Sequence, residues 1–437
     1  MLTWQEMNGR LCPCGKTHST DIAVISGRDA LLQLPCAIQK LGGSKAFVLC
    51  DPNTYKAAGE AVCALLQKNA LPHTLYTLPQ DHPIPHEETV GSVMMHYDCS
   101  CDVIVAVGSG VINDVAKILS CVSGKPFIVV ATAPSMDGYA SASSSMERDG
   151  LKTSLATRAP DVIIGDSAIL CAAPRALMQA GLGDMLAKYV SLAEWRIANL
   201  LLGEYYCEDI AALVRSALKK CADNAEGLLR GEEAAVMAVF EGLVIGGIAM
   251  NYAGLSRPAS GCEHYISHVL DMRGVSLGTT TRLHGIQVAV GTLICARLYD
   301  KLRSYSPDPK KAEDFVAAFC LQDWNDELRK LLGSSADSMI AQEAKEQKYD
   351  KSTHPARLQK IVASWNSILA ILEQELPAAT ELEKLLDTIG APKTLEELGT
   401  SEGLLPTIFA ATKDIRDKYV LSRLCWDLGL LEESFFQ

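Results

Sequence analysis

The chain has 437 residues, of which 48% are hydrophobic and 21% are charged, and its formal net charge is −12 at pH 7. This composition is typical of a globular protein with a large core, and the length predicts two domains. The acidic balance excludes nucleic acid and anionic membrane surfaces as general partners, but it leaves room for a small anionic substrate held by local basic groups.

The cysteine pattern indicates a reducing compartment. Fifteen cysteines are scattered along the chain without the spacing of a disulfide framework. Several, such as Cys63, Cys121 and Cys295, stand inside apolar segments, where a thiol acts as a small hydrophobe. The first residues do not resemble a signal peptide, and no apolar run reaches the roughly 18 residues that predict a membrane span. We therefore expect a cytoplasmic protein.

Strand and helix patterns alternate through the first third of the chain. Short apolar runs predict strands over residues 21–25, 45–50, 74–78, 102–107 and 127–131. Helical spacing separates them over residues 30–41, 54–69, 87–96 and 111–120. This alternation predicts a Rossmann-like α/β domain over residues 1–165, with a parallel sheet between two layers of helices.

Strand signals disappear after about residue 165, and amphipathic stretches take their place. We expect helices over residues 174–194, 204–229, 232–252 and 285–298. Near the end of the chain, Thr394 and Glu397 have the spacing of a capping box. Residues 166–437 are therefore predicted to form a helical domain.

A glycine-rich turn follows the predicted strand 102–107. The segment begins Gly108-Ser109-Gly110 and continues into a predicted helix. Glycines let backbone amides approach an anion closely, and a helix N-terminus adds partial positive charge, so a pyrophosphate fits here. The spacing lacks the third glycine of the dinucleotide fingerprint, and an ordinary tight turn is the alternative.

Two further polar features stand where predicted strands end. Asp51 follows the strand 45–50 and is suited to a ribose hydroxyl, although it equally fits the N-cap of the next helix. The segment 132–141 follows the strand 127–131 and contains small hydroxyl side chains. Ligands bind at the carboxyl ends of strands in sheets of this kind, so both features are candidate cofactor contacts.

One carboxylate and three histidines are candidates for a metal site. Asp184 is expected at the head of a helix, and His264 and His268 are one helical turn apart. His284 follows shortly after them. One carboxylate and two imidazoles suit a divalent metal that keeps an open position for substrate. Each residue taken alone has the alternative of an ordinary surface or capping role.

These motifs together resemble the superfamily of iron-containing alcohol dehydrogenases and dehydroquinate synthases, and within it the glycerol-1-phosphate dehydrogenase family. The resemblance rests on residues 108–117, 132–141, 181–195, 256–268 and 283–288. It implies a dehydroquinate synthase-like fold, in which an α/β dinucleotide-binding domain precedes an all-α metal-binding domain.

The resemblance also implies a role for individual residues. It assigns NAD or NADP to Asp51, Gly108, Ser109, Gly110, Val111, Ile112, Asn113, Asp114, Thr132, Ala133, Pro134, Ser135 and Ser141. It assigns one divalent metal (zinc, with nickel or iron as alternatives) to Asp184, His264 and His284. It places Asp137, Asp184 and His268 at the substrate. Among these, Asp184, His268 and Asp137 are the implied catalytic residues.

The implied reaction is hydride transfer between dihydroxyacetone phosphate and glycerol 1-phosphate. His268 is the candidate for proton transfer, with a metal-bound water as the alternative. A guanidinium suits a phosphate group, so Arg257 is the leading candidate for phosphate recognition, unless it only bridges two helices. We expect a homo-oligomer, a dimer or larger, that acts on this small phosphorylated substrate.

Three other functions stay open from the sequence. A glycerol or polyol dehydrogenase would keep the metal and lose the phosphate site, and a dehydroquinate synthase-like lyase would release phosphate. Asp184 disfavours the lyase, which in this resemblance carries glutamate at that position. A non-catalytic binding protein with the same fold is the third alternative. Separately, Cys12, Cys14 and His18 offer three soft metal ligands, one fewer than a structural zinc site uses.

Overall fold

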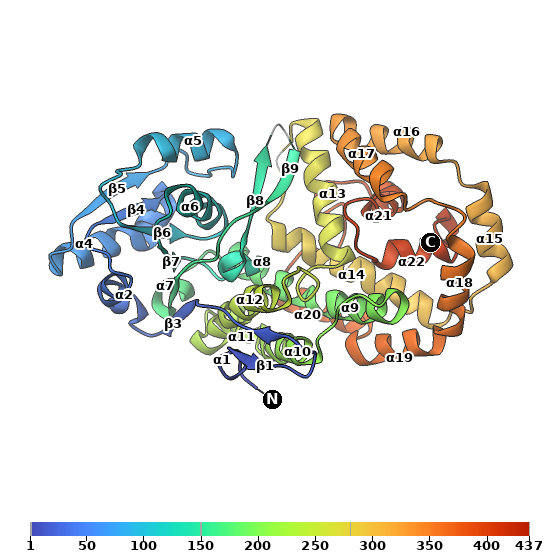
Figure 1. Ribbon diagram of the computed structural model, residues 1–437, viewed down its shortest axis with the longest axis horizontal. Helices are drawn as coiled ribbons and strands as arrows, with labels where there is room; N and C mark the ends of the chain where they lie inside the picture. Colours follow the sequence, from blue (N-terminus) through green and yellow to red (C-terminus); the bar gives the residue numbers. More distant parts are fainter. Residues whose placement is uncertain (1, 149–150, 280, 437) are drawn as a thin grey trace. The chain divides into compact units, whose positions relative to one another are not determined.

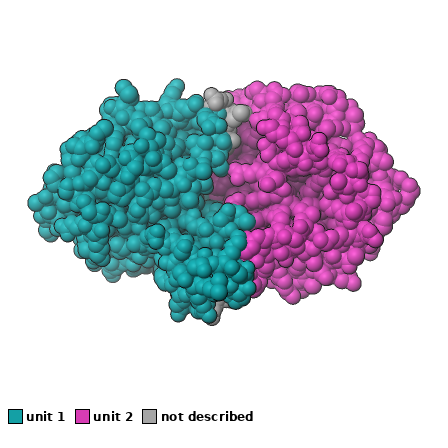
Figure 2. Space-filling view, viewed as in Figure 1, with its two compact units in different colours: residues 1–185, 212–255 teal, residues 186–211, 256–437 magenta. Residues whose placement is uncertain are grey.

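The computed structural model describes residues 2–148, 151–279 and 281–436. The chain forms two compact units (Figure 2). Unit 1 comprises Met1–Met185 and Ala212–Leu255, and unit 2 comprises Leu186–Ala211 and Ser256–Gln437. Each unit buries an apolar core of its own.

A six-stranded parallel sheet is the centre of unit 1 (Figure 1). Its strands, in spatial order, are β3 (Ala23–Gly27), β10 (Val162–Asp166), β7 (Phe127–Ala131), β6 (Val103–Gly108), β4 (Ala46–Cys50) and β5 (His73–Thr77). The four inner strands are buried along their whole length, as expected for a parallel sheet covered on both faces. The five predicted strands are confirmed, and β10 is an addition.

The helices of unit 1 connect these strands or pack beside them. They are α1 (Trp4–Met7), α2 (Leu34–Lys40), α3 (Pro52–Thr54), α4 (Glu60–Lys68), α5 (Glu87–His96), α6 (Gly110–Ser123), α7 (Ser167–Cys171), α8 (Arg175–Leu186), α10 (Glu208–Asp223), α11 (Ala225–Leu229) and α12 (Glu233–Ala253). The first residues of α10 belong to unit 2. The predicted helix 54–69 is interrupted by a π-helical turn over Tyr55–Gly59.

Two antiparallel hairpins complete unit 1. The first pairs β1 (Arg10–Leu11) with β2 (Thr17–His18), and the second pairs β8 (Ser143–Arg148) with β9 (Leu151–Ala156). Neither was predicted, because the first has strands of two residues and the second is rich in serine and charged side chains. Both lack the apolar alternation that predicts a strand.

The compact unit around the sheet extends beyond residue 165. α12 contacts α7, α11 and the 3-10 turn η3 (Asp137–Ala140), and Phe240 of α12 packs against the backbone of Gly165. The change from strands to helices therefore falls near the predicted position, but the helices that follow are shared between the units. Among the described residues, α12 is the one helix long and apolar enough to cross a membrane, and 72% of its most apolar window is buried.

Unit 2 consists of helices packed around a large apolar core, with a smaller apolar cluster beside it. They are α9 (Lys188–Leu202), α13 (Cys262–Leu277), α14 (His284–Arg303), α15 (Pro309–Ala318), α16 (Leu321–Leu332), α17 (Ala336–Glu346), α18 (His354–Ala363), α19 (Trp365–Glu375), α20 (Ala379–Ile389), α21 (Leu405–Thr412) and α22 (Leu421–Asp427). The segment after residue 300 supplies much of the core around α13 and α14. The predicted capping box of Thr394 and Glu397 forms, but on a turn rather than a helix.

Candidate active site

The glycine-rich turn lies at the junction of β6 and α6. β6 ends at Gly108 and α6 begins at Gly110. A Cβ atom at Gly108 would lie 2.5 Å from Cβ of Ile112, so a larger residue there would displace the first turn of α6. The hydroxyl groups of Ser109 and Ser135 share a hydrogen bond. The turn thus leads directly into a helix N-terminus, the arrangement that suits a pyrophosphate.

This turn stands at a topological switch point of the sheet. From β4 the chain runs outward to β5, whereas from β6 it runs the other way to β7. In open α/β sheets, ligands bind at the carboxyl ends of strands where the order reverses. Asp51 at the end of β4 and Ser109 at the end of β6 flank this point.

Asp51 has the capping role that the sequence left open. One carboxylate oxygen accepts hydrogen bonds from the backbone N–H groups of Asn53 and Thr54, each at 2.8 Å. The Thr54 hydroxyl in turn accepts from the Asp51 backbone N–H at 2.9 Å, which completes a capping box. A ribose contact through the second oxygen is compatible with this geometry and stays a prediction.

Two of the predicted cofactor contacts on α6 face the protein interior. The side chain of Asn113 is fully buried and donates to the carbonyl oxygen of Gly138 at 3.1 Å. Ile112 is 1% exposed. Their side chains therefore hold α6 against its neighbours, and cofactor contact at these two positions, which backbone N–H groups could make, stays a prediction. Gly110, Val111 and Asp114, by contrast, are partly exposed on the same helix.

Lys117 holds the loop that follows β7. Its ammonium group donates to the carbonyl oxygens of Gly138 and Ser143 at 2.7 and 2.8 Å and to the hydroxyl of Ser141 at 3.0 Å. Burial lowers the pKa of Lys117, and the nearby Asp114 carboxylate opposes that shift. Ser141 is 5% exposed and committed to this network, so its hydroxyl shapes the loop rather than reaching outward.

The rest of this loop is pressed against α8. Thr132, Ala133, Pro134 and Ser135 are all buried. A Cβ atom at Gly181 would lie 1.8 Å from the carbonyl oxygen of Pro134, so only glycine permits this approach. This close approach fixes the loop after β7 against α8.

Asp184 lies in the last turn of α8, not at the head of a helix as predicted. The predicted helix 174–194 is divided, because α8 ends at Leu186 and α9 begins at Lys188. The carboxylate of Asp184 is fully buried and accepts a hydrogen bond from the backbone N–H of Asp137 at 2.8 Å. The structure therefore joins two predicted substrate residues, Asp184 and Asp137.

The three histidines gather on two neighbouring helices of unit 2. His264 and His268 lie on α13, and His284 opens α14. The ring centroid of His284 is 5.2 Å from that of His264 and 6.1 Å from that of His268. A ring nitrogen of His264 and one of His284 lie within 4.8 Å of each other. Two imidazoles at this separation suit a shared cation.

Hydrogen bonds to Nδ1 orient the two imidazoles. The Nδ1 atom of His264 bonds a carboxylate oxygen of Glu263 at 2.9 Å, and that of His284 bonds the Ser267 hydroxyl at 3.2 Å. A metal-binding histidine characteristically uses its second nitrogen in this way, so Nε2 is the candidate ligand atom in each case. The sequence reasoning missed Glu263, although it directly precedes His264.

A second buried carboxylate stands beside Glu263. Glu194 of α9 accepts hydrogen bonds from the backbone N–H groups of Cys262 and Leu421 at 3.0 and 2.9 Å. Burial raises the pKa of Glu194 to about 8, and the charge of Glu263 adds to the shift. These bonds fix the first turn of α13, on which His264 stands.

Arg257, the predicted candidate for phosphate recognition, bonds two other segments of unit 2. Its guanidinium donates to both carboxylate oxygens of Glu204, at 2.7 and 2.9 Å, and to the carbonyl oxygen of Tyr419 at 2.8 Å. The side chain is 2% exposed. The alternative weighed from the sequence, a bridge between separate segments, is therefore the one that this geometry supports.

Known proteins identify the family. Residues 25–174 match the family described as iron-containing alcohol dehydrogenase. The chain is 34% identical over 293 residues to glycerol-1-phosphate dehydrogenase (NAD(P)+) of Halalkalibacterium halodurans, covering 66% of this chain and 73% of that relative. The chain belongs to the glycerol-1-phosphate dehydrogenase family of iron-containing alcohol dehydrogenases.

The likeness to this family extends over nearly the whole chain. Glycerol-1-phosphate dehydrogenase (NAD(P)+) of Bacillus licheniformis is 29% identical over 425 residues, covering 96% of this chain and 93% of the relative. The corresponding protein of Pyrococcus furiosus is 35% identical over 277 residues, covering 63% of this chain and 78% of that one. The match to the Bacillus relative therefore spans more of this chain than the match to the archaeal one.

Solved structures confirm the fold class. Glycerol dehydrogenase from Schizosaccharomyces pombe has a TM-score of 0.60 at 19% identity, covering 95% of this chain and 89% of that one. A 1,3-propanediol oxidoreductase has a TM-score of 0.62 at 17% identity, covering 93% and 97% respectively. The predicted dehydroquinate synthase-like architecture, a dinucleotide-type α/β unit with a helical partner, is therefore confirmed.

Proposed function

We propose that this protein is an sn-glycerol-1-phosphate dehydrogenase, which interconverts dihydroxyacetone phosphate and sn-glycerol 1-phosphate by hydride transfer with a nicotinamide dinucleotide. The observation that carries the proposal is the imidazole pair of unit 2. His264 and His284 offer ring nitrogens within 4.8 Å of each other, while their Nδ1 atoms bond Glu263 and Ser267. Family membership supports the same reaction.

We assign the divalent metal to Asp184, His264 and His284. The donor set fits such a cation, because one oxygen and two nitrogens leave a position open for substrate. One oxygen of Asp184 accepts from the Asp137 backbone, which holds its carboxylate in one rotamer. Zinc, nickel and iron all accept these ligands, so availability selects among them.

The cofactor site is assigned to the switch point of the sheet. We place the pyrophosphate at the N-terminus of α6, beside Gly108, Ser109 and Gly110, where backbone N–H groups and the helix dipole favour negative charge. Thr132 and Ser135 line the next strand end. Asp51 receives the adenosine ribose, and its charge disfavours a ribose phosphate, so we propose NAD over NADP as the preferred cofactor.

The remaining chemistry is divided between two side chains and the bound groups. When bound, the metal polarises the substrate oxygen and the nicotinamide supplies or accepts the hydride. We propose that His268, partly exposed and 6.1 Å from His284 between ring centroids, transfers the proton to or from that oxygen. Asp137, held by its backbone bond to Asp184, orients a substrate hydroxyl.

Substrate profiling tests the proposal. NADH oxidation is followed with dihydroxyacetone phosphate and with dihydroxyacetone, and the reverse reaction with sn-glycerol 1-phosphate and its 3-phosphate enantiomer. We expect turnover that requires the phosphate group, selects the 1-phosphate, stops after chelation and returns with added metal. Equal rates for the unphosphorylated substrates would support a polyol dehydrogenase instead. Phosphate release would support a lyase, and inactivity at full metal content would support a non-catalytic protein.

Location and assembly complete the proposal. None of the fifteen cysteines, all among the described residues, forms a disulfide, which fits the cytoplasm. A homo-oligomer, dimer or larger, remains our prediction. Light scattering of the purified protein measures its mass. A mass equal to that of one chain would contradict this prediction.

A further inference from the structure

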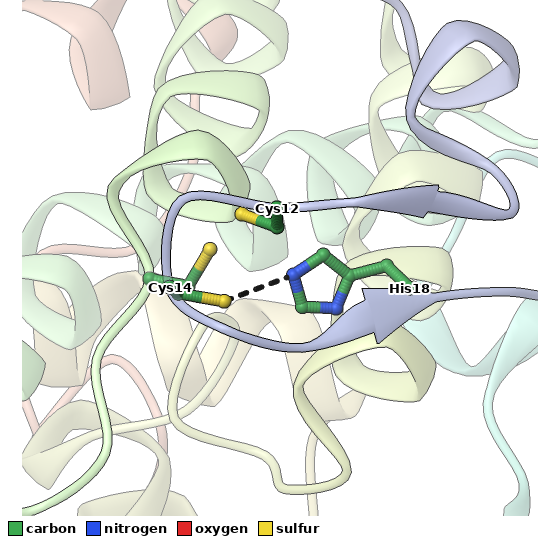
Figure 3. A group of neighbouring side chains, drawn as sticks. Cys12, Cys14 and His18 are labelled. Carbon is green, nitrogen blue, oxygen red and sulfur yellow. Dashed lines mark hydrogen bonds between the residues drawn. The ribbon is translucent and has the colours of Figure 1, made fainter.

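The N-terminal hairpin brings together three metal-ligand side chains, none of which is among the residues assigned to catalysis. Cys12 follows β1, Cys14 lies in the turn, and His18 ends β2 (Figure 3). Figure 3 shows the three side chains directed toward one another. One ligand atom from each lies within 4.8 Å of the others. We propose that this hairpin binds a structural zinc ion, with Cys207 as the fourth ligand.

The geometry of Cys14 and His18 matches one edge of a zinc tetrahedron. Sγ of Cys14 lies 3.4 Å from Nε2 of His18. Zinc bonds sulfur at about 2.3 Å and nitrogen at about 2.0–2.1 Å, and at the tetrahedral angle these bonds place the two atoms about 3.5 Å apart. The two side chains are therefore already at the separation that the ion requires.

The orientation of His18 is fixed by the other ring nitrogen. Nδ1 bonds the carbonyl oxygen of Tyr252 on α12 at 3.0 Å, and the imidazole stacks on the Tyr252 ring at 5.6 Å. A carbonyl oxygen only accepts, so Nδ1 carries the proton and Nε2 presents its lone pair to the cysteines. This is the outer-shell bond that orients metal-binding histidines. His18 is also 2% exposed, which a surface histidine would not be.

The turn itself is built to hold two thiolates close. Gly15 donates its backbone N–H to the Cys12 carbonyl at 2.9 Å and has φ of 86°, a conformation that favours glycine. The strands on either side have two residues each. An isolated two-stranded hairpin is only marginally stable, and a metal bound by residues next to both strands would stabilise it.

Cys207 is the best candidate among the buried cysteines for the fourth ligand. Eight cysteines are buried: Cys12, Cys50, Cys101, Cys207, Cys221, Cys262, Cys295 and Cys425. Four of them pack in the hydrophobic cores, namely Cys50, Cys262, Cys295 and Cys425. Cys221 donates to the Ala238 carbonyl, and Cys101 lies beside Thr74 of β5.

Cys207 directly precedes α10. Its carbonyl accepts from the Ala211 backbone N–H at 3.0 Å, so it stands at the start of α10. Three cysteines and one histidine make a closed site, the type that stabilises a fold rather than catalyses a reaction.

Metal content and cobalt spectroscopy test the proposal. The full chain is expressed with zinc under reducing conditions, and metal is measured by mass spectrometry in wild type and in the double variant C12S/C14S. We expect the double variant to lose about one zinc per chain, as loss of one closed site requires. The control C36S/C99S removes two exposed cysteines and should keep the wild-type content.

Cobalt separates this site from the catalytic one. Asp184, His264 and His284 contain no sulfur, so thiolate-to-cobalt charge-transfer absorption in the cobalt-loaded protein reports the hairpin alone. We expect these bands in wild type and in H284A, and their loss in C12S/C14S. Failure of the proposed dehydrogenase activity would leave this result unchanged, so the two proposals fail separately.

Three outcomes would overturn the inference. The first is a wild-type cobalt spectrum without sulfur bands, which is decisive even if the variants do not fold. The second is unchanged zinc content in a folded C12S/C14S protein. The third is a Cys12–Cys14 disulfide in zinc-free protein purified under reducing conditions. An unchanged cobalt spectrum in C207S would overturn the assignment of the fourth ligand.

Discussion

Glu263 and His264 are neighbours in the chain and are joined by a hydrogen bond of 2.9 Å between a carboxylate oxygen and Nδ1. The same oxygen accepts from the Gly261 backbone N–H at 2.7 Å, which fixes the carboxylate at the start of α13. This pair sets both the rotamer and the tautomer of an assigned metal ligand.

Replacing Glu263 by alanine should therefore weaken metal binding without removing a ligand. We expect the dissociation constant of the divalent metal to rise by about 10- to 100-fold, the usual cost of losing such a partner. Competition with a fluorescent chelator measures it. E88A, at a side chain that is 92% exposed, is the control. An unchanged affinity in E263A would show that the bond does not orient His264.

Gly181 should tolerate no side chain. In G181A the new Cβ would meet the Pro134 carbonyl at 1.8 Å, so the loop after β7 must move. We expect a loss of about 1–3 kcal/mol in unfolding free energy, as for other overpacked sites, together with a higher KM for NADH. Urea unfolding and steady-state kinetics measure the two effects.

Gly91 provides the matched control for Gly181. It also lies within a helix, α5, but a Cβ atom there meets nothing within 4 Å. Alanine is the better helix former by about 1 kcal/mol, so G91A should be neutral or slightly more stable. Equal effects of the two substitutions would contradict the close approach of the loop and α8.

Arg257 should affect stability and not phosphate selectivity. R257K would lose most of the bonds to Glu204 and Tyr419, and we expect a cost of about 1–3 kcal/mol in unfolding free energy. The ratio of kcat/KM for dihydroxyacetone phosphate to that for dihydroxyacetone should stay at the wild-type value. A fall in kcat/KM for dihydroxyacetone phosphate alone would show that Arg257 takes part in phosphate recognition. R230K, at an exposed arginine, is the control.

Lys413 should make the unfolding free energy depend on pH in the alkaline range. Burial lowers its pKa to about 8 from the model-compound value of 10.5, in spite of the adjacent Asp414, and its ammonium lies 3.6 Å from the Trp324 ring centroid. Between these pH values the unfolded chain keeps a proton that the folded chain has released. Rising pH therefore favours the folded state through this group, and the gain is lost as pH falls toward 8.

The comparison of wild type with K413M isolates this group. Relative to K413M, the unfolding free energy of wild type should rise by about 1–3 kcal/mol as the pH increases from 8 to 10.5. Denaturant unfolding at several pH values measures the difference. A difference that is flat across the window would show that Lys413 keeps its ordinary pKa.

The sequence predicted the sheet well because its strands are apolar runs separated by glycines and helical spacing. β4, β6 and β7 lie close to their predicted bounds. β10 is equally apolar but directly precedes a helix, and periodicity alone does not distinguish a short buried strand from a helical segment. The break between α8 and α9 carries no glycine or proline, so no helix-stop signal marks Asp184 as part of the last turn of α8.

The candidate site could be predicted from the sequence only where its residues lie close together in the chain. His264 and His268 share one helix, and the spacing of four residues places them on one face. Arg257 and Asn113 have partners far along the chain, at Tyr419 and Gly138, so their roles depend on tertiary packing that no local pattern reports. Glu263 is recognisable in the sequence as an acidic residue next to a candidate ligand histidine. An acidic residue is also common at an ordinary helix start, so this signal alone does not identify its role.

The central claim is that one divalent metal is held by Asp184 together with His264 and His284. Crystals of the metal-loaded protein, measured on both sides of the absorption edge of the bound metal, test it most directly. We predict an anomalous peak bonded to a carboxylate oxygen of Asp184 and to Nε2 of both histidines. A peak bonded to the histidines with Asp184 elsewhere, or no peak at α13 and α14, would contradict the account.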